Sequence, residues 1–154
     1  MSPTGGKRIE GGRTIQATTR TRPLTTATPA RHVARGVSLL FVTAGLWGFI
    51  EPPVFGLVET NPLYNLLHLL LASLGLYFGF ARLPDAYATG FAQAMGLFLL
   101  IIGVTGLLTA PLLDGPGLRL LNASHAALGL LALAAARADL RREAAAERAS
   151  PEAS

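Results

Sequence analysis

The sequence contains no cysteine, and this absence excludes several kinds of chemistry at once. Disulfide frameworks, thiolate zinc sites, iron–sulfur clusters, covalently attached haem and cysteine nucleophiles all need that side chain. Charge is also scarce, because 14% of the 154 residues are charged, whereas a soluble domain carries about a quarter. Between residues 33 and 136 only seven residues carry a formal charge. The composition therefore predicts a membrane protein.

Familiar motifs for catalysis and transport are missing as well. The sequence has no nucleotide-binding loop, zinc-protease motif or serine-hydrolase motif, and no Asp, Glu or Lys in the middle of an apolar stretch. Residues of that kind carry the coupling ions in pumps and carriers. The net charge is +4, but the basic residues lie beside apolar stretches with almost no aromatic residues among them, which favours a role in membrane orientation. We therefore expect a non-enzymatic protein that binds no nucleic acid.

Four apolar stretches fill the middle of the chain, over residues 33–50, 63–80, 86–109 and 118–136. The shortest has 18 residues, and at about 1.5 Å per residue this length approaches the ~30 Å hydrocarbon thickness of a bilayer. Because lipid offers the backbone no hydrogen-bond partner, these stretches must be helices. Short, proline-containing connections make successive helices antiparallel. The sequence thus predicts an all-α integral membrane four-helix bundle, connected up-down-up-down, within residues 31–137.

The two ends of the chain differ from the apolar stretches in composition. Residues 1–30 are rich in Thr, Gly, Arg and Pro and have no apolar periodicity, which predicts a disordered basic tail. Residues 138–154 have mixed charge and many helix formers, which predicts a helical or disordered tail. Twelve of the thirteen Lys and Arg residues fall on the membrane face shared by both tails. The positive-inside rule then predicts that both termini are cytoplasmic, in the inner (cell) membrane.

Two of the predicted helices carry the same polar pair. Asn65 and His68 lie in the second span, and Asn122 and His125 lie 57 residues further on in the fourth. A weaker echo links glycines of the first and third spans, 58 residues apart. The i, i+3 spacing places each Asn and His on one helix face. We therefore expect a tandem repeat of two helical hairpins, with the four side chains converging in the outer-leaflet half of the bundle core.

Three hypotheses account for these polar pairs. The first is a network of hydrogen bonds between helices without any cofactor, because buried polar groups in a membrane need partners. The second is haem b, with His68 and His125 as the two axial ligands. The third is a proton relay or a metal. A metal would need further ligands, and only Glu51, Glu59 and Asp114 lie on that side of the membrane, so no metal site is assigned.

Small residues indicate where helices pack closely. Gly75 and Gly79 form a GxxxG pair in the second span, and Gly96 and Gly103 share one face of the third. We expect these faces to pack within the bundle, with a membrane-protein partner or a second copy of the chain as the alternative. The functional class expected is an accessory or structural subunit in the lipid bilayer. The alternatives are an electron-transfer subunit that binds haem b and a permease for small molecules or protons.

Several short motifs together resemble a bacterial membrane-protein family of unknown function that is common in actinobacteria. The motifs are Ala34-Arg35-Gly36, Gly45 with Gly48-Phe49, Asn65 with His68-Leu69-Leu70, and Asn122 with His125 and Gly129. The resemblance covers about residues 31–137 and implies four spans and a membrane location. It implies no activity, ligand or catalytic residue. Members of the family often carry Gly four residues after the second-span histidine, where this sequence has Ala72.

Overall fold

The computed structural model of the protein describes residues 27–54, 56–113 and 116–149. Most of these residues belong to four helices, α1 (Pro29–Ile50), α2 (Pro62–Phe80), α3 (Asp85–Leu113) and α4 (Pro116–Ala149). Every helix is long and apolar enough to cross a membrane. Within the described ranges the chain forms no strand. The predicted all-α fold of a multi-pass membrane protein is therefore confirmed.

The first two helices begin in the same way, with a polar cap followed by proline. The Thr28 hydroxyl accepts a hydrogen bond from the Arg31 amide at 3.4 Å, and the Asn61 side chain accepts one from the Tyr64 amide at 3.0 Å. Each cap satisfies an amide that the first turn leaves without a partner, and the proline that follows has no amide to satisfy. As a result α1 begins earlier than predicted, and Ala30, which was expected in the flexible tail, is fully buried.

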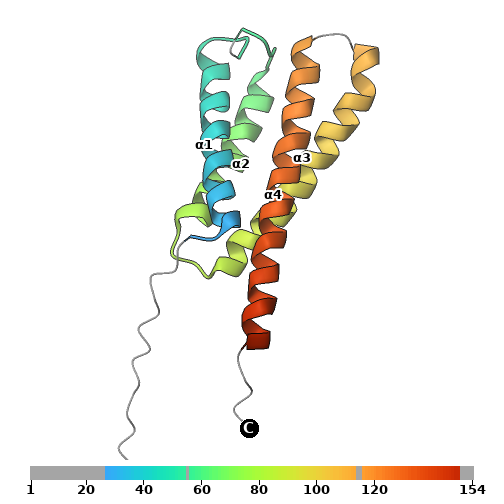
Figure 1. Cartoon of the computed structure of the whole chain (residues 1–154). Helices are drawn as coiled ribbons and strands as arrows, with labels where there is room; N and C mark the ends of the chain where they lie inside the picture. Colours follow the sequence, from blue (N-terminus) through green and yellow to red (C-terminus); the bar gives the residue numbers. More distant parts are fainter. Residues whose placement is uncertain (1–26, 55, 114–115, 150–154) are drawn as a thin grey trace, which may run out of the picture.

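The helices pair into two antiparallel hairpins, α1–α2 and α3–α4, which stand next to each other (Figure 1). Contacts between the hairpins run mainly from α1 to α3 and α4, while the backbones of α2 and α4 are diagonal and stay apart. The beginning of α1 and the end of α4 lie at the same end of the bundle, at the bottom of Figure 1. This arrangement is the predicted up-down-up-down bundle.

The two hairpins repeat one contact between their helices. A Cβ atom on Gly48 of α1 would overlap the side chain of Asn65 on α2. A Cβ atom on Gly106 of α3 would overlap the side chain of Asn122 on α4 in the same way. Each asparagine thus lies against a glycine of the preceding helix, where any larger residue would push the two helices apart. The equivalent contacts confirm that the fold is a tandem repeat of helical hairpins.

The four glycines singled out from the sequence all lie at contacts inside the bundle. Gly75 and Gly79 of α2 lie against side chains of α1, and Gly96 and Gly103 of α3 lie against the backbone of α4. A Cβ atom at any of these positions would come within 3.0 Å of a neighbouring atom. Close approach within the bundle therefore explains these glycines, and a second subunit is not required for them.

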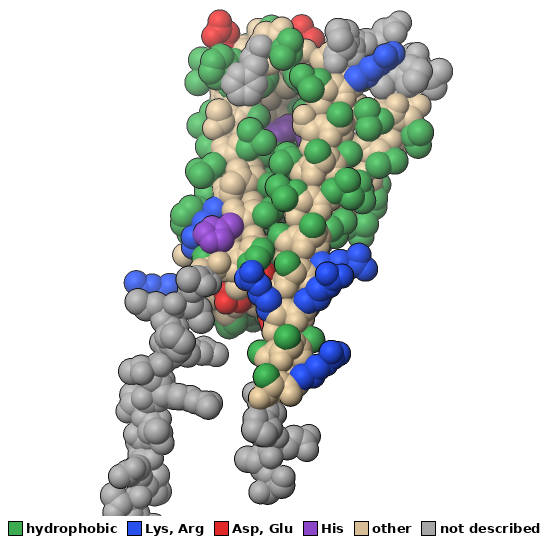
Figure 2. Space-filling model, in the orientation of Figure 1, with side chains coloured by type: hydrophobic (Ala, Val, Ile, Leu, Met, Phe, Trp, Pro, Cys, Tyr) green, Lys and Arg blue, Asp and Glu red, His purple; other side chains and the backbone are tan. Residues whose placement is uncertain are grey.

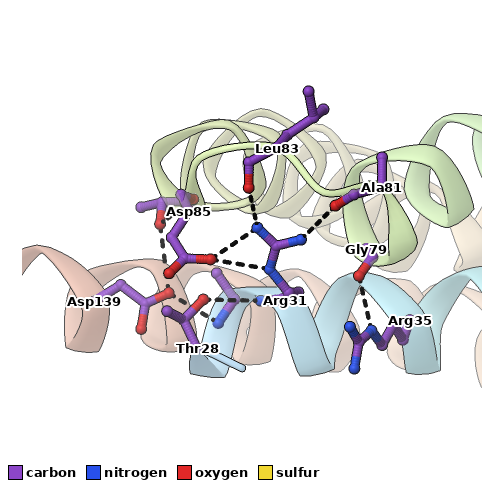
Figure 3. A network of polar contacts seen from close by, with 10 residues as sticks. Thr28, Arg31, Arg35, Gly79, Ala81, Leu83, Asp85 and Asp139 are labelled. Atoms are coloured by element: carbon purple, nitrogen blue, oxygen red, sulfur yellow. Dashed lines mark hydrogen bonds and ion pairs between the residues drawn. The ribbon is translucent and has the colours of Figure 1, made fainter. Parts of the chain in front are cut away.

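A network of polar contacts joins the helices at the end that holds both termini (Figure 3). The Arg31 guanidinium, which is almost fully buried, donates to the Asp85 carboxylate at 2.8 and 3.0 Å. It also donates to the backbone carbonyls of Ala81 at 2.8 Å and Leu83 at 2.6 Å. A single arginine of α1 therefore holds the turn between α2 and α3 and the beginning of α3.

Asp139 extends this network to α4. Its carboxylate accepts hydrogen bonds from the Ala30 amide at 3.0 Å and from the Thr89 hydroxyl at 3.4 Å. The residue is only 2% exposed, although the sequence pattern placed it in an exposed tail beyond the fourth span. Because α4 runs without a break to Ala149, the bundle extends past the predicted boundary at residue 137.

Charge and apolar surface are separated along the bundle (Figure 2). Large apolar side chains are exposed on all four helices, as expected for surfaces that face lipid. Most arginines lie at the end with the termini, whereas Glu51, Glu59 and Arg119 lie at the other end. Residues 1–26 of the disordered tail predicted over residues 1–30 fall outside the described residues, as do Asp114 and the last residues of the chain.

Candidate functional site

His68 of α2 and His125 of α4 lie side by side in the half of the bundle away from the termini. Their ring centroids are 6.1 Å apart, and the ring planes differ by 28°. Since α2 and α4 are the diagonal helices, the two imidazoles meet across the centre of the bundle. The structure thus brings together the two histidines that the sequence repeat paired.

Phe41 of α1 completes an aromatic cluster with the two histidines. Its ring lies 5.0 Å from the His68 ring and 6.3 Å from the His125 ring, with its plane steeply inclined to both. It is buried and packs in the same core as Leu99 of α3. The sequence analysis did not identify Phe41, because an aromatic residue in an apolar span carries no pattern that separates a site wall from ordinary core.

The two imidazoles differ in their hydrogen bonds. His68 Nδ1 lies 2.8 Å from the backbone oxygen of Tyr64, one turn earlier on the same helix. A carbonyl oxygen only accepts, so Nδ1 carries a proton, and in the neutral imidazole Nε2 then holds a lone pair. His125 Nδ1 is buried and has no hydrogen-bond partner in the described part of the chain. One imidazole is therefore fixed by its own helix, while the other has a nitrogen that still needs a partner.

Asn65 and Asn122 are both buried, with 2% and 6% of their surface exposed. Asn65 Oδ1 has no hydrogen-bond partner among the described residues. No hydrogen bond there links these two asparagines and the two histidines to one another. The two histidine rings meet, whereas each asparagine side chain lies against a glycine of its own hairpin, so no direct network of hydrogen bonds joins the four residues in the described part of the chain.

A cavity of about 190 Å³ lies beside the histidines, on the side of the bundle between α1 and α4. The loop between α1 and α2 contributes Val54, Leu57 and Val58 to its walls. Gly117 lets this loop come close to the start of α4, because a Cβ atom there would overlap the Leu57 carbonyl. Figure 2 looks into the hollow between these two helices, where a histidine surface is visible. The loop and both hairpins thus contribute to the walls of the site.

Three polar atoms around this apolar cavity are buried and have no hydrogen-bond partner among the described residues: Thr60 Oγ1, Asn65 Oδ1 and His125 Nδ1. Each unpaired buried group of this kind costs about 1–3 kcal/mol. A mostly apolar cavity with a few convergent polar atoms is the usual form of a small-molecule site. The sequence analysis missed Thr60, because it lies in the connection ahead of the second span and belongs to no motif.

A smaller cavity of about 100 Å³ lies on the opposite side of the histidines, between α2 and α3. Phe41, His68 and His125 line both cavities. Neither Glu51 nor Glu59 lines either of them. Within the described residues, no three His, Asp or Glu side chains gather where they could hold a metal ion. The two histidines and Phe41 thus lie between the two cavities.

No family model, curated protein or solved structure matches this chain. The family resemblance of the short motifs therefore stays a prediction. Function has to be inferred from the chemistry of the pocket beside His68 and His125.

Proposed function

We propose that this protein is a non-enzymatic accessory protein of the membrane that binds a small uncharged molecule between its two hairpins. The observation that carries the proposal is the meeting of His68 and His125 beside a cavity of about 190 Å³. Each hairpin contributes one histidine, so the site exists only when the two repeats are packed together.

The hydrogen bonds favour ligand binding over a purely structural role for these residues. Histidines that only held helices together would bond across the bundle. His68 instead donates to a carbonyl of its own helix, and Asn65 Oδ1 and His125 Nδ1 have no partner among the described residues. A ligand with polar groups would supply the missing partners in a low-dielectric interior, where such hydrogen bonds are strongest.

The residues that line the cavity favour an uncharged ligand that is bound without being chemically changed. Among the described residues, no Asp, Glu, Lys or Arg lines the cavity, so a charged ligand would be desolvated without a counterion from them. The Ser124 hydroxyl donates to the Leu120 carbonyl at 2.8 Å, and no hydrogen bond among the described residues links the hydroxyl of Ser124 or Thr60 to a histidine. A neutral ligand that is bound rather than transformed fits these walls.

Haem b is a second candidate, favoured by one distance. Two imidazoles on opposite sides of one metal ion, with metal–nitrogen bonds of about 2.0–2.1 Å, have ring centroids roughly 6 Å apart. The centroids of His68 and His125 are 6.1 Å apart. His68 Nε2 carries the lone pair that such an ion would need.

In this conformation the Phe41 ring occupies space that haem would need. The three ring-to-ring distances place the Phe41 ring about 5 Å from the midpoint between the two imidazoles. A porphyrin centred at that midpoint would cover the same space. Haem would bind only if the Phe41 side chain, buried against Leu99 of α3, moved out of the core. The small-ligand proposal needs no such rearrangement.

The charge distribution supports an orientation for the site. Apart from Arg119, every arginine that the structure describes lies at the end with both termini. Lys and Arg are enriched on the cytoplasmic side of membrane proteins. We therefore place both termini in the cytoplasm, and the pocket then lies in the outer half of the membrane.

The test is to purify the protein in a mild detergent, record its absorption spectrum and analyse an organic extract by mass spectrometry. We expect a colourless protein that retains a lipid-soluble compound. The double variant His68→Ala/His125→Ala should lose this compound. Tyr87→Ala, an exposed aromatic position on α3 away from the cavity, is the control and should retain it.

Two outcomes would overturn the proposal. A wild-type extract no richer in any compound than that of the double variant would leave the pair with a structural role alone. A Soret band that disappears in either single histidine variant would replace the small ligand with haem.

A further inference from the structure

A groove between α1 and α4 borders the cavity beside the histidines. The groove has a volume of about 270 Å³ and shares Leu40 and Leu128 with the cavity. It follows α1 from Leu40 to His32, a length of about 12 Å at 1.5 Å per residue. Gly36 lines it and has no atom within 4 Å of the position of a Cβ atom. The cavity, with its polar atoms, can therefore be described as a head, and the mostly apolar groove beside it as a tail.

Two of the polar atoms in the head of this space are acceptors. His68 Nε2 holds a lone pair because the Nδ1 proton is bonded to the Tyr64 carbonyl. Asn65 Oδ1 is a buried acceptor without a partner, on a residue that is 2% exposed. A neutral molecule with hydroxyl groups can donate to both of these atoms and accept from the Thr60 hydroxyl, which has no partner among the described residues. Hydroxyl groups are the donors that a membrane-soluble molecule most readily carries.

The size and the walls of the head favour a single ring. An apolar protein cavity of about 150 Å³ is large enough to bind benzene, and this cavity has about 190 Å³. Phe41, His68 and His125 present rings to it. Aromatic rings pack favourably against one another in edge-on and offset arrangements. One substituted aromatic ring therefore fits both the volume and the lining.

We infer that the ligand is a hydroxylated aromatic lipid of the phenol or hydroquinone class. Its ring would occupy the cavity, with hydroxyl groups donating to His68 Nε2 and Asn65 Oδ1, and its alkyl or isoprenoid tail would lie in the groove between α1 and α4. The inference rests on the proposed function, because it names the ligand of the same pocket. It concerns binding alone and includes no electron transfer.

The test of the head uses the full-length purified protein and three probes with the same tail: decylhydroquinone, its dimethyl ether and decylbenzene. Dissociation constants are measured by equilibrium dialysis in detergent. We expect decylhydroquinone to bind about tenfold to hundredfold more tightly than the ether, because the ether leaves the buried acceptors unpaired. Equal affinities for the hydroquinone and the ether would overturn the assignment of hydroxyl donors.

The test of the tail uses Gly36→Phe, which fills the groove where a side chain meets no neighbour. This variant should bind decylhydroquinone roughly tenfold more weakly, because the tail loses apolar contact, while methylhydroquinone should bind as in the wild type. Gly90→Phe on α3 is the matched control, because Gly90 also has open space at the Cβ position and lies outside the groove. Unchanged binding of decylhydroquinone by Gly36→Phe would overturn the placement of the tail.

Failure of this inference and failure of the proposed function can be told apart. If decylhydroquinone does not bind, but the wild type still retains a compound that His68→Ala/His125→Ala loses, only the ligand class is wrong. If no probe binds and no compound is retained, both are wrong. Melting temperatures of all variants in the same detergent show whether each one is folded.

Discussion

The two ends of the bundle bury polar groups in opposite ways. At the end with the termini, Arg31 donates to one carboxylate and two carbonyls, and Asp139 ties α4 to the same network. At the other end, Thr60, Asn65 and His125 each keep a buried polar atom without a partner in the described part of the chain. The first end is completed by residues of the chain, and we propose that the second is completed by a ligand.

The contrast shows where this protein gives up stability. Natural sequences satisfy their buried polar groups almost everywhere, and exceptions concentrate at functional sites. Asp139 Oδ1 also lacks a partner, but Oδ2 of the same carboxylate accepts two hydrogen bonds. Near the histidines the unpaired atoms surround an apolar cavity, so a bound molecule is the simplest way to satisfy them.

The largest effect is expected from a test of which end faces the cytoplasm. Reporter fusions at Gly56, in the loop between α1 and α2, and at the C-terminal residue Ser154 should give opposite, all-or-none signals. Both termini should report cytoplasmic, because the arginines gather at that end. An external signal from the Ser154 fusion would reverse the bundle and place the histidine pocket in the inner half of the membrane.

Arg31→Met should destabilise the protein by about 3 kcal/mol, because the Asp85 carboxylate and two carbonyls lose their buried donor. The free energy of unfolding is measured in mixed micelles with increasing denaturing detergent. Arg137→Met is the matched control, since Arg137 is exposed on α4 at the same end. The control should change stability by no more than about 0.5 kcal/mol. Similar effects in the two variants would mean that the network is not what holds this end.

Because the contact between glycine and asparagine is repeated, replacing the glycine should destabilise the protein equally in the two hairpins. Gly48→Ala and Gly106→Ala should each lower the free energy of unfolding by about 1–3 kcal/mol, because the new methyl group overlaps Asn65 or Asn122. Gly36→Ala, with open space at its Cβ position, should instead raise it by about 0.5–1 kcal/mol through helix propensity.

A double variant sharpens this prediction. In the Asn65→Ala background the cost of Gly48→Ala should largely disappear, because the overlapping side chain is gone. An unchanged cost in that background would show that the glycine is needed for a contact other than the asparagine.

Much of this fold could be predicted from the sequence because membrane spans obey strong physical rules. Apolar length fixes the four helices, and the repeat of Asn65–His68 at Asn122–His125 fixes which helix faces meet. The predicted helix boundaries are less accurate at the end of the bundle that holds the termini. The Thr28 cap and the burial of Asp139 depend on contacts between residues far apart in sequence, which no local pattern reveals.

The candidate site was predictable only in part, and for a similar reason. A motif identified the histidines, but Thr60 and Phe41 belong to no motif and join the site through packing. The expected hydrogen bonds between the four polar residues followed from chemistry that is sound for buried groups. They are not formed, because each asparagine is held against a glycine of its own hairpin, and that geometry is set by the backbone.

The smallest effects give the most direct comparison of the two ends. Thr89→Val removes a hydroxyl that bonds to Asp139 and to the Asp85 carbonyl, and should lower the free energy of unfolding by about 1 kcal/mol. Thr60→Val removes a buried hydroxyl without a partner among the described residues, and should raise it by about 1 kcal/mol in the ligand-free protein. Unfolding measured side by side should therefore give opposite signs for one chemical change. Saturating decylhydroquinone should reduce the gain from Thr60→Val, if that hydroxyl bonds to the ligand, and leave the loss from Thr89→Val unchanged. The same sign for both substitutions without ligand would mean that the two ends satisfy their polar groups equally well.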